Sequence, residues 1–356
     1  MTMKRVLITG AGGIAGVNFS RAISLDKSLE LFGTENNEYH TIFNPIKFFK
    51  IPNANDPNYI NQLNNIIKSN QISFLHPQPT PEIQKIVQNI EKISTRTFLP
   101  SSDIVLRDKS EQQSLLLKKG QKVTKTFLVS KLSDVDQIID QIKFPVWVRA
   151  KKGVGGRLSN KCNSIKEIKL WIELCVLQGR AMLNEFIIQE YHGGRDLAWD
   201  SLWYDGKLIV SYSRERLEYP FAKLTMSGIT GTPTIARIIH DDKINKLGIE
   251  SVRMMSSKPH GCFSLDIKED LDNTPYITEI DSGKFHTTIG LWGFLAEKNL
   301  QLDWYTNIPR LYVHLGTDGD IPVTNQMDIY PEDLYLIRNL DCGAWIRLNN
   351  KKEKVI

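Results

Sequence analysis

The densest group of side chains that could do chemistry lies in the C-terminal third of the chain. Two short runs, Gly261–Asp266 and Pro275–Asp281, flank a polar turn and are typical of the two strands of a hairpin. Glu279 and Asp281 are two residues apart, so both project from one face of their strand, near Asp266. Carboxylates on one face repel one another unless a cation neutralises them, and oxygen ligands suit Mg²⁺ that bridges nucleotide phosphates. The hairpin therefore predicts a metal site formed by these three acids.

The opposite orientation of the hairpin is also open, with the acids in solvent and Tyr276, Thr278 and Ile280 facing inward. The next segment, residues 282–288, favours the metal site because it brings Lys284 and several hydroxyl side chains directly after the acids. A site that binds a metal together with phosphate needs both signs of charge within reach.

A second candidate site lies in the middle of the chain. The apolar run Val146–Ala150 predicts a strand that carries Arg149 and leads into a cationic loop rich in glycine. Arg149 could fork to phosphate oxygens, Lys151 could add charge, and the amides of Gly155 and Gly156 could approach a triphosphate closely. A solvated basic hairpin loop explains the same residues equally well, since the loop is not a Walker motif.

A third glycine-rich turn, Gly10 to Gly16, follows an apolar strand at the N-terminus and precedes a helix. Such a turn is typical of a dinucleotide site, with Glu35 after the second strand as a ribose ligand. Glycines that merely allow a tight turn are the favoured interpretation. A short-chain dehydrogenase would also need Tyr-x-x-x-Lys on a helix, and the one match, Tyr219 with Lys223, contains Pro220.

The elements that must position these residues fall into two patterns. In the first hundred residues short strands alternate with helices, which is typical of a parallel α/β lobe. Beyond a predicted charged helix at Asp108–Lys119, short alternating strands and two helices predict an α+β arrangement with much antiparallel sheet. The predicted domains are an α/β lobe at 1–104, a flap subdomain with its linking helix at 105–185, a large subdomain with the metal site at 186–318, and a C-terminal extension packed on the core at 319–356.

Composition limits the class of protein. The 356 residues carry 45 basic and 40 acidic side chains, a formal charge of +5, and the lysines are scattered, which argues against a nucleic-acid arm. Four cysteines lie too far apart for a zinc site or a disulfide scaffold. The N-terminus enters a strand directly, and no apolar segment is long enough for a signal peptide or a membrane span. We therefore expect a cytoplasmic protein that binds neither nucleic acid nor membrane.

The order of these motifs resembles the ATP-grasp superfamily, specifically its carbamoyl-phosphate synthase large-subunit-like and biotin-carboxylase-like branch, over roughly residues 1 to 315. Asp108-Lys109 matches the start of the family's linking helix, and Pro145-Val-Trp-Val-Arg149 matches the strand before its glycine-rich flap. Ile187-Ile-Gln-Glu190-Tyr191, followed by Asp196, matches the segment that holds adenine and ribose, and Asp266 with Glu279-Ile-Asp281 matches the metal motif.

Two departures from the family pattern affect the metal motif. Asp281 replaces the usual Asn, and Ser282-Gly283-Lys284 replaces the usual Pro-Arg. Asp281 still offers an oxygen ligand to a metal. Lys284 still supplies a cation, but at a slightly different distance from the site.

The resemblance implies a Rossmann-like lobe preceding a two-part ATP-grasp fold. It also implies an ATP- and Mg²⁺-dependent (or Mn²⁺-dependent) carboxylate-amine ligase that forms an acyl phosphate for attack by an amine or thiol. Its partners would be small-molecule carboxylates and amines, and a homodimer is one option. An NAD(P)-dependent oxidoreductase and an ATP-binding protein without catalysis are the alternatives.

The resemblance assigns roles to four sets of residues. The catalytic pair is Lys284 and Arg149. The ATP-binding residues are Lys109, Arg149, Lys151, Gly155, Gly156, Gln189, Glu190, Tyr191 and Asp196. The metal ligands are Asp266, Glu279 and Asp281. Candidates for binding the acceptor are Gly12, Gly13, Arg214, Arg216, Thr230, Thr232 and His286.

Overall fold

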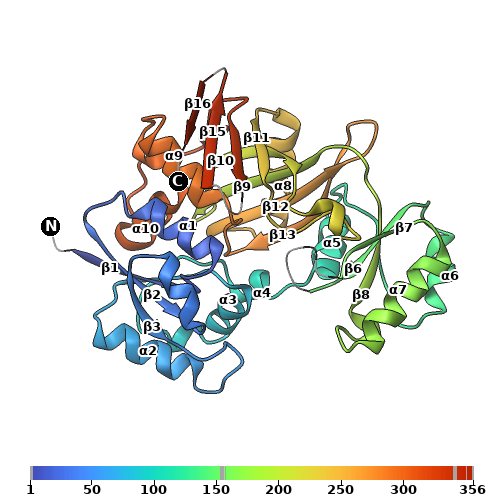
Figure 1. Cartoon of the computed structure of the whole chain (residues 1–356), viewed down its shortest axis with the longest axis horizontal. Coiled ribbons are helices and arrows are strands. Elements are labelled where there is room, and N and C mark those ends of the chain that lie inside the picture. Colours follow the sequence, from blue (N-terminus) through green and yellow to red (C-terminus); the bar gives the residue numbers. More distant parts are fainter. Residues whose placement is uncertain (1–2, 153–155, 157, 340–342, 350, 355–356) are drawn as a thin grey trace.

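The computed structural model describes residues 3–152, 156, 158–339, 343–349 and 351–354. Three sheets make up the molecule, and Figure 1 shows the N-terminal one below the largest one, with the third set apart at the far end. Gly155, one of the predicted ATP-binding residues, lies outside the described residues.

The N-terminal lobe is built on a four-stranded parallel sheet with the order β3-β2-β1-β4. Its elements are β1 (Lys4–Thr9), α1 (Ile14–Ile23), β2 (Leu29–Glu35), β3 (Lys47–Lys50), α2 (Tyr59–Ser69), β4 (Phe74–Pro77), α3 (Thr80–Val87) and α4 (Ser102–Val105). The predicted alternation of strands and helices is confirmed. The short edge strand β3 was missed because its sequence, Lys-Phe-Phe-Lys, gives too few alternating positions to read.

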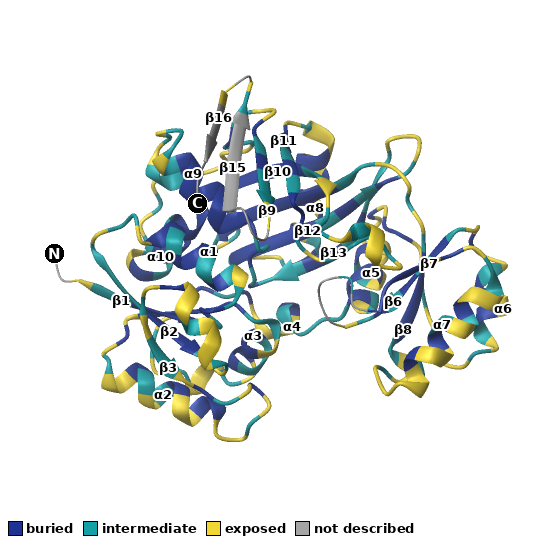
Figure 2. Cartoon of the chain, in the orientation of Figure 1, coloured by how far each residue is buried: buried dark blue, intermediate teal, exposed yellow. Residues whose placement is uncertain are grey.

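The largest sheet has eight strands in the order β13-β12-β9-β10-β11-β14-β15-β16, all antiparallel to their neighbours. The strands are β9 (Asp196–Tyr204), β10 (Lys207–Glu218), β11 (Ile235–Ile239), β12 (Gly261–Glu269), β13 (Pro275–Ser282), β14 (Tyr335–Asn339), β15 (Gly343–Leu348) and β16 (Lys351–Lys354). Helices α9 (Ile289–Lys298) and α10 (Ile308–Asp318) cover one face, where they share a hydrophobic core with the N-terminal lobe. Helix α8 (Asp242–Met255) covers the other face, and Figure 2 shows the central strands buried between these layers.

The third sheet has four strands in the order β5-β8-β6-β7 and its own hydrophobic core. Its elements are β5 (Thr126–Leu128), α6 (Asp134–Ile139), β6 (Val146–Ala150), β7 (Asn160–Cys162), α7 (Ile165–Leu177) and β8 (Phe186–Glu190). The predicted domain limit between residues 185 and 186 separates β8 from the strands with which it pairs. That limit is better placed after β8, because sheet pairing joins strands that are distant in sequence. The other limits stay predictions.

Helix α5 (Lys109–Lys118) connects the lobe to the third sheet and packs along β13 (Figure 1). Asp108 caps it in a reciprocal capping box with Glu111. The charged helix predicted over residues 108–119 is confirmed, and its face buried against β13 carries Gln112 and Gln113 as well as Leu116.

The architecture is therefore a mixed α/β fold with one parallel and two antiparallel sheets, as the fold class predicted. Within the part of the chain that the structure describes, every helix is too short or too polar to cross a membrane.

Candidate active site

The acids of the predicted hairpin lie next to one another on the large sheet. Strand β12 pairs with β13 so that Asp266 is directly opposite Glu279, and Asp281 is opposite Ser264. Glu279 is only 7% exposed, so the orientation that places the acids in solvent is wrong. Ile280 is buried on the opposite face, against the α8 side. Both faces of this hairpin are therefore covered, which the sequence pattern alone could not show.

Glu279 is neutralised by two cations from outside the large sheet. Its carboxylate lies 2.7 Å from Lys109 Nζ, at the start of α5, and 3.0 Å from Arg149 Nη2, on β6 of the third sheet. All three side chains are largely buried. Lys109 and Arg149 were both predicted to hold phosphate, and the structure brings them to one carboxylate. A polyphosphate is therefore the kind of anion that this pair of cations could accept.

Asp266 belongs to a buried network of charges. It pairs with Arg216 on β10, and it lies 3.2 Å from His286 Nε2. The Nδ1 atom of the same imidazole is 2.9 Å from Asp200, which is fully buried and also pairs with Arg214. Burial alone would lower the pKa of His286, but Asp200 and Asp266 outweigh it and raise that pKa. Arg214 Nη2 also lies 2.9 Å from that Nδ1 atom, so the imidazole is surrounded by two carboxylates and one guanidinium.

Lys284 forms an ion pair with Asp281, with Nζ 2.6 Å from the carboxylate. Burial disfavours the charged amine, but Asp281 outweighs this effect and raises the pKa of Lys284. Gly283 has a φ of +79°, and a side chain there would point at Pro100 and Leu99. This left-handed conformation favours glycine at position 283, directly before Lys284.

A cavity of about 320 Å³ lies between the large sheet and the third sheet, and we call it the inter-sheet cavity. Trp147 of the third sheet lines this cavity, and so does His192, which follows β8. The His192 ring stacks on Tyr276, with ring centroids 4.2 Å apart. Six of the predicted ATP-binding residues line it, namely Arg149, Gly156, Gln189, Glu190, Tyr191 and Asp196. The cavity lies in the volume range of small-molecule sites.

A second cavity of about 430 Å³ lies between the large sheet and the N-terminal lobe, and we call it the sheet–lobe cavity. Five of the predicted acceptor-binding residues line it, namely Gly13, Arg216, Thr230, Thr232 and His286. Arg214 does not, because it is buried in its pair with Asp200. Lys284 lines this cavity too. The two cavities share Asp266, Glu279 and Arg216, so the acid pair stands where they meet.

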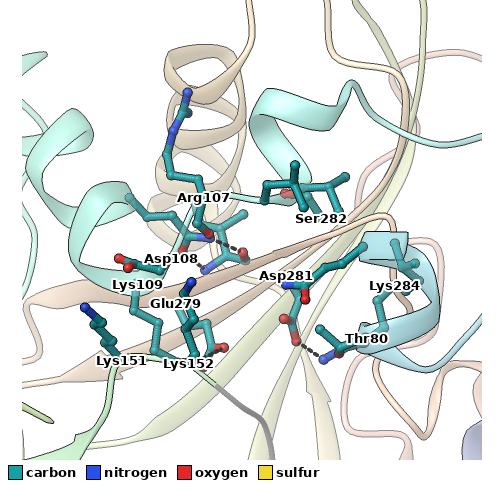
Figure 3. A pocket seen from close by; sticks show the side chains of 16 residues that line it. Thr80, Arg107, Asp108, Lys109, Lys151, Lys152, Glu279, Asp281, Ser282 and Lys284 are labelled. Atoms are coloured by element: carbon teal, nitrogen blue, oxygen red, sulfur yellow. Dashed lines mark hydrogen bonds and ion pairs between the residues drawn. The ribbon is translucent and has the colours of Figure 1, made fainter. Parts of the chain in front are cut away.

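A smaller cavity of about 70 Å³ joins the start of α5 to the end of β13. Figure 3 shows Glu279 with Lys109, Lys151 and Lys152 on one side of it, and Asp281 with Lys284 beside Thr80 on the other. Lys109 and Lys151, both predicted to bind ATP, thus line this cavity and not the inter-sheet one. The acid strand is therefore surrounded by lysines from three segments.

Part of the N-terminal glycine turn is occupied by contacts within the lobe. The Gly12 amide donates to Glu35 Oε2 at 3.1 Å, and an added side chain at Gly12 would meet His40 at 2.7 Å. Glu35, the expected ribose ligand, is thus occupied inside the turn, and Gly12 does not line the sheet–lobe cavity. The glycines allow close packing, as the favoured interpretation held.

Two charged residues of the site were missed from the sequence. Asp200 interrupts the apolar strand β9, and a charge in such a strand is a recognisable signal of a buried network. Lys268 was assigned to the turn of the hairpin, but it lies on β12 with Nζ 2.7 Å from Asp196. The strand continues to Glu269 because its pairing with β9 extends to Asp196.

The side chains around Asp266 and Glu279 show whether this site could hold Mg²⁺. Among the described residues, no three His, Cys, Asp or Glu side chains are grouped closely enough to hold a metal alone. Mg²⁺ is usually held by one or two carboxylates together with substrate phosphates and water. The adjacent Asp266 and Glu279, next to cations that suit phosphate, meet that requirement.

No protein-family model matches the chain, and no curated protein matches it in sequence. Solved structures are similar to it in fold over nearly its whole length. The chain has the ATP-grasp fold.

One similar structure is the biotin carboxylase domain of the Hydrogenobacter thermophilus 2-oxoglutarate carboxylase, a dimer in complex with MgADP, ADP and bicarbonate. It shares 12% identity and a TM-score of 0.69, and the match covers 94% of this chain and 74% of that one. Another is the N5-carboxyaminoimidazole synthetase of Staphylococcus aureus with ADP, at 15% identity, TM-score 0.69, and coverage of 95% and 82%. A third is the L-amino acid ligase of Bacillus licheniformis, at 12% identity, TM-score 0.67, and coverage of 94% and 79%.

Proposed function

We propose that this protein is an ATP- and Mg²⁺-dependent ligase that activates a carboxylate as an acyl phosphate for attack by an amine or a thiol. The observation that carries the proposal is the meeting of two cavities at Asp266 and Glu279. One cavity suits a nucleotide and the other an acceptor, and the acid pair between them is surrounded by cations. Phosphoryl transfer needs this arrangement of positioning and charge neutralisation.

The inter-sheet cavity would bind ATP. Its base would lie against the end of β8, near Tyr191 and His192, and Asp196 would accept from the ribose hydroxyls. The phosphates would reach Arg149 and Lys109, which in the structure hold Glu279. Gly156 packs close to Ile229, so the glycine loop and the segment after β10 would together cover the phosphates and exclude water.

Asp266, Glu279 and Asp281 would hold one or two Mg²⁺ ions. When bound, Mg²⁺, or Mn²⁺ with the same preference for oxygen ligands, neutralises charge on the phosphates. Asp281 in place of the family's Asn adds a negative charge, and Lys284 compensates it through their ion pair.

The sheet–lobe cavity would bind the carboxylate to be activated. Lys284 would neutralise charge on the transferred phosphoryl or acyl group, and His286 and Arg216 would keep Asp266 in place. Thr230 and Thr232 supply hydroxyls for a small polar acceptor. Two of the similar structures contain ADP, and one of them also contains MgADP and bicarbonate, which supports the choice of a nucleotide, a metal and a small carboxylate as ligands.

The proposal also covers the cellular compartment and the oligomeric state of the protein. We infer a cytoplasmic enzyme that acts on small molecules, as the scattered charge and the separated cysteines indicate. A homodimer is proposed from the dimer of the similar biotin carboxylase domain.

The direct test measures ADP release with Mg-ATP across a panel of carboxylates, including bicarbonate and the twenty amino acids, each with and without amines. The double variant Glu279→Gln with Asp281→Asn should abolish Mg-ATP turnover while the fold stays intact. Asp272→Asn, an exposed acid in the turn of the same hairpin, is the matched control and should leave turnover unchanged.

Three outcomes would contradict the proposal in different ways. Unchanged ADP release in the double variant would refute the site assignment. ATP binding by the wild type without ADP release on any substrate would favour a binding protein without catalysis. Thermal stabilisation by NAD(H) and not by Mg-ATP would favour an oxidoreductase.

A further inference from the structure

The strand that carries Glu279 and Asp281 is an edge strand. Strand β13 pairs with β12 on one side, and among the described residues the strand-type pairing on its other side is limited to an isolated bridge between Val123 and Ile277. An edge strand exposes N–H and C=O groups that water would otherwise satisfy. Next to buried acids and cations those groups need other partners.

Helix α5 supplies the hydrogen bonds that a neighbouring strand would make. Gln112 Nε2 donates to Ile280 O at 2.8 Å, and its Oε1 accepts from Ile280 N at 3.0 Å. Gln113 Nε2 donates to Ile277 O at 3.0 Å. Both glutamines are at most 5% exposed. The residue between the two acids is thus held at both of its backbone groups by one amide side chain.

The segment after β13 is held in the same way by the N-terminal lobe. Gln78 Nε2 donates to Phe285 O at 3.0 Å, and Asn18 Nδ2 donates to Thr287 O at 2.9 Å. Both amides are only 6% exposed. They come from parts of the chain more than 200 residues away, and they bracket the residue that carries the imidazole, His286.

The other end of the Gln78 amide meets a buried histidine, His76. His76 is fully buried and stacks on Phe19 with ring centroids 3.8 Å apart. Burial lowers the pKa of His76 to about 3, so its ring is neutral. The Phe285 carbonyl can only accept, so the amide nitrogen of Gln78 faces it. The Oε1 atom of Gln78 then faces His76 Nε2 at 3.0 Å, which assigns the hydrogen of the neutral ring to Nε2.

Side chains along this segment alternate between two environments. Phe285 packs among Phe19 and Tyr312, whereas Lys284 and His286 point to Asp281 and Asp266. Fixing the carbonyls therefore fixes which side chains face the sheet–lobe cavity.

We propose that these four buried amides, Asn18, Gln78, Gln112 and Gln113, are positioning residues, which we call the amide array. They hold the backbone from Ile277 to Thr287 so that its acids and cations meet the substrates. Amides suit this role because they donate and accept without adding charge beside the acid pair. The inference rests on the proposed function, and it goes beyond it by giving α5 and the N-terminal lobe a part in the chemistry.

Hydrogen exchange tests the array without any turnover. Gln112→Met removes the acceptor of the Ile280 amide, whose exchange should become faster by about tenfold or more, as expected when a buried hydrogen bond is lost. Gln112→Glu keeps an acceptor oxygen, so protection of Ile280 should largely remain. Gln88→Met, at an exposed position at the end of α3, is the matched control. Unchanged exchange at Ile280 in Gln112→Met would overturn the proposal.

Kinetics separates positioning from general stability. Gln112→Met and Gln78→Met should each lower kcat roughly 10- to 100-fold, measured as ADP release with the most active carboxylate of the panel. The KM for ATP should stay within about twofold, because the residues proposed to hold the base, Tyr191 and His192, are not bonded to the array in the part of the chain that the structure describes. If KM for ATP rose in step with the fall in kcat, the array would be a structural support only. Absence of ADP release by the wild type would refute the proposed function, and hydrogen exchange would still decide the inference about the amide array. If Gln112→Met does not fold, Gln78→Met and Asn18→Leu test the array instead. The readout is then exchange of the Ile289 amide, which donates to His286 O.

Discussion

The pairing of one acid with two cations makes Glu279→Gln an informative substitution. In the structure Glu279 offsets Lys109 and Arg149, whose side chains are only 6% and 13% exposed. Arg149 Nε is also buried without a hydrogen-bond partner. Removing the negative charge leaves two cations in a poorly solvated place. Breaking a buried ion pair by deleting one partner costs about 3–5 kcal/mol. The unliganded variant should therefore melt several degrees below the wild type.

The same substitution should change how nucleotide binding depends on Mg²⁺. In the wild type, a phosphate that reaches Lys109 and Arg149 meets the Glu279 carboxylate as a like charge. Two unit charges about 4 Å apart repel by about 4 kcal/mol at the effective dielectric constant of a protein surface. Mg²⁺ should relieve this repulsion, so we expect it to tighten binding of a non-hydrolysable ATP analogue by at least about tenfold, or 1.4 kcal/mol. In Glu279→Gln the repulsion is absent.

Isothermal titration calorimetry with that analogue, with Mg²⁺ or with EDTA, measures both affinities. The Mg²⁺ effect should fall to within about twofold in Glu279→Gln, and the analogue alone should stabilise the variant more than it stabilises the wild type. Asp272→Asn should behave as the wild type does. A variant that keeps the full Mg²⁺ effect, or that melts with the wild type, would refute the assignment of Glu279.

Two further predictions concern the cations around the acids. Lys284→Met should lower the rate of ADP release about 100-fold, as expected when one group that stabilises developing charge is lost. The affinity for the ATP analogue should stay unchanged. Turnover equal to that of the wild type would refute the role of Lys284 in catalysis. At Asp200, burial would raise the pKa, but Arg214 and His286 outweigh it and hold the pKa far below its usual range. Its contribution to stability is then present above the unfolded pKa of about 4 and is lost as pH falls below it. The melting temperature of the wild type should therefore drop more steeply from pH 5 to pH 3 than that of Asp200→Asn, and parallel curves would contradict this reasoning.

Patterns that depend on near neighbours in the chain could be predicted from the sequence. The hairpin of β12 and β13 follows from alternating side chains around a polar turn, and the structure confirms that Asp266 and Glu279 are opposite each other. The strand that carries Arg149 was also predicted with the bounds that the structure shows. Local periodicity is sufficient for such elements, because each buries one face whatever it packs against.

The sequence by itself thus determined the types of element, the acid hairpin and the order of motifs that resembles the ATP-grasp superfamily. Only the tertiary structure decided that Lys109 and Arg149 both meet Glu279, and that the cavities on either side share it. It also decided that Gln112 and Gln78 face the backbone of the acid segment. The physical reason is that an amide or a lysine has no preferred environment in its own neighbourhood of the chain. Its partner is determined only when distant segments pack together. The buried backbone groups and charges of one segment must then be satisfied by side chains of another segment.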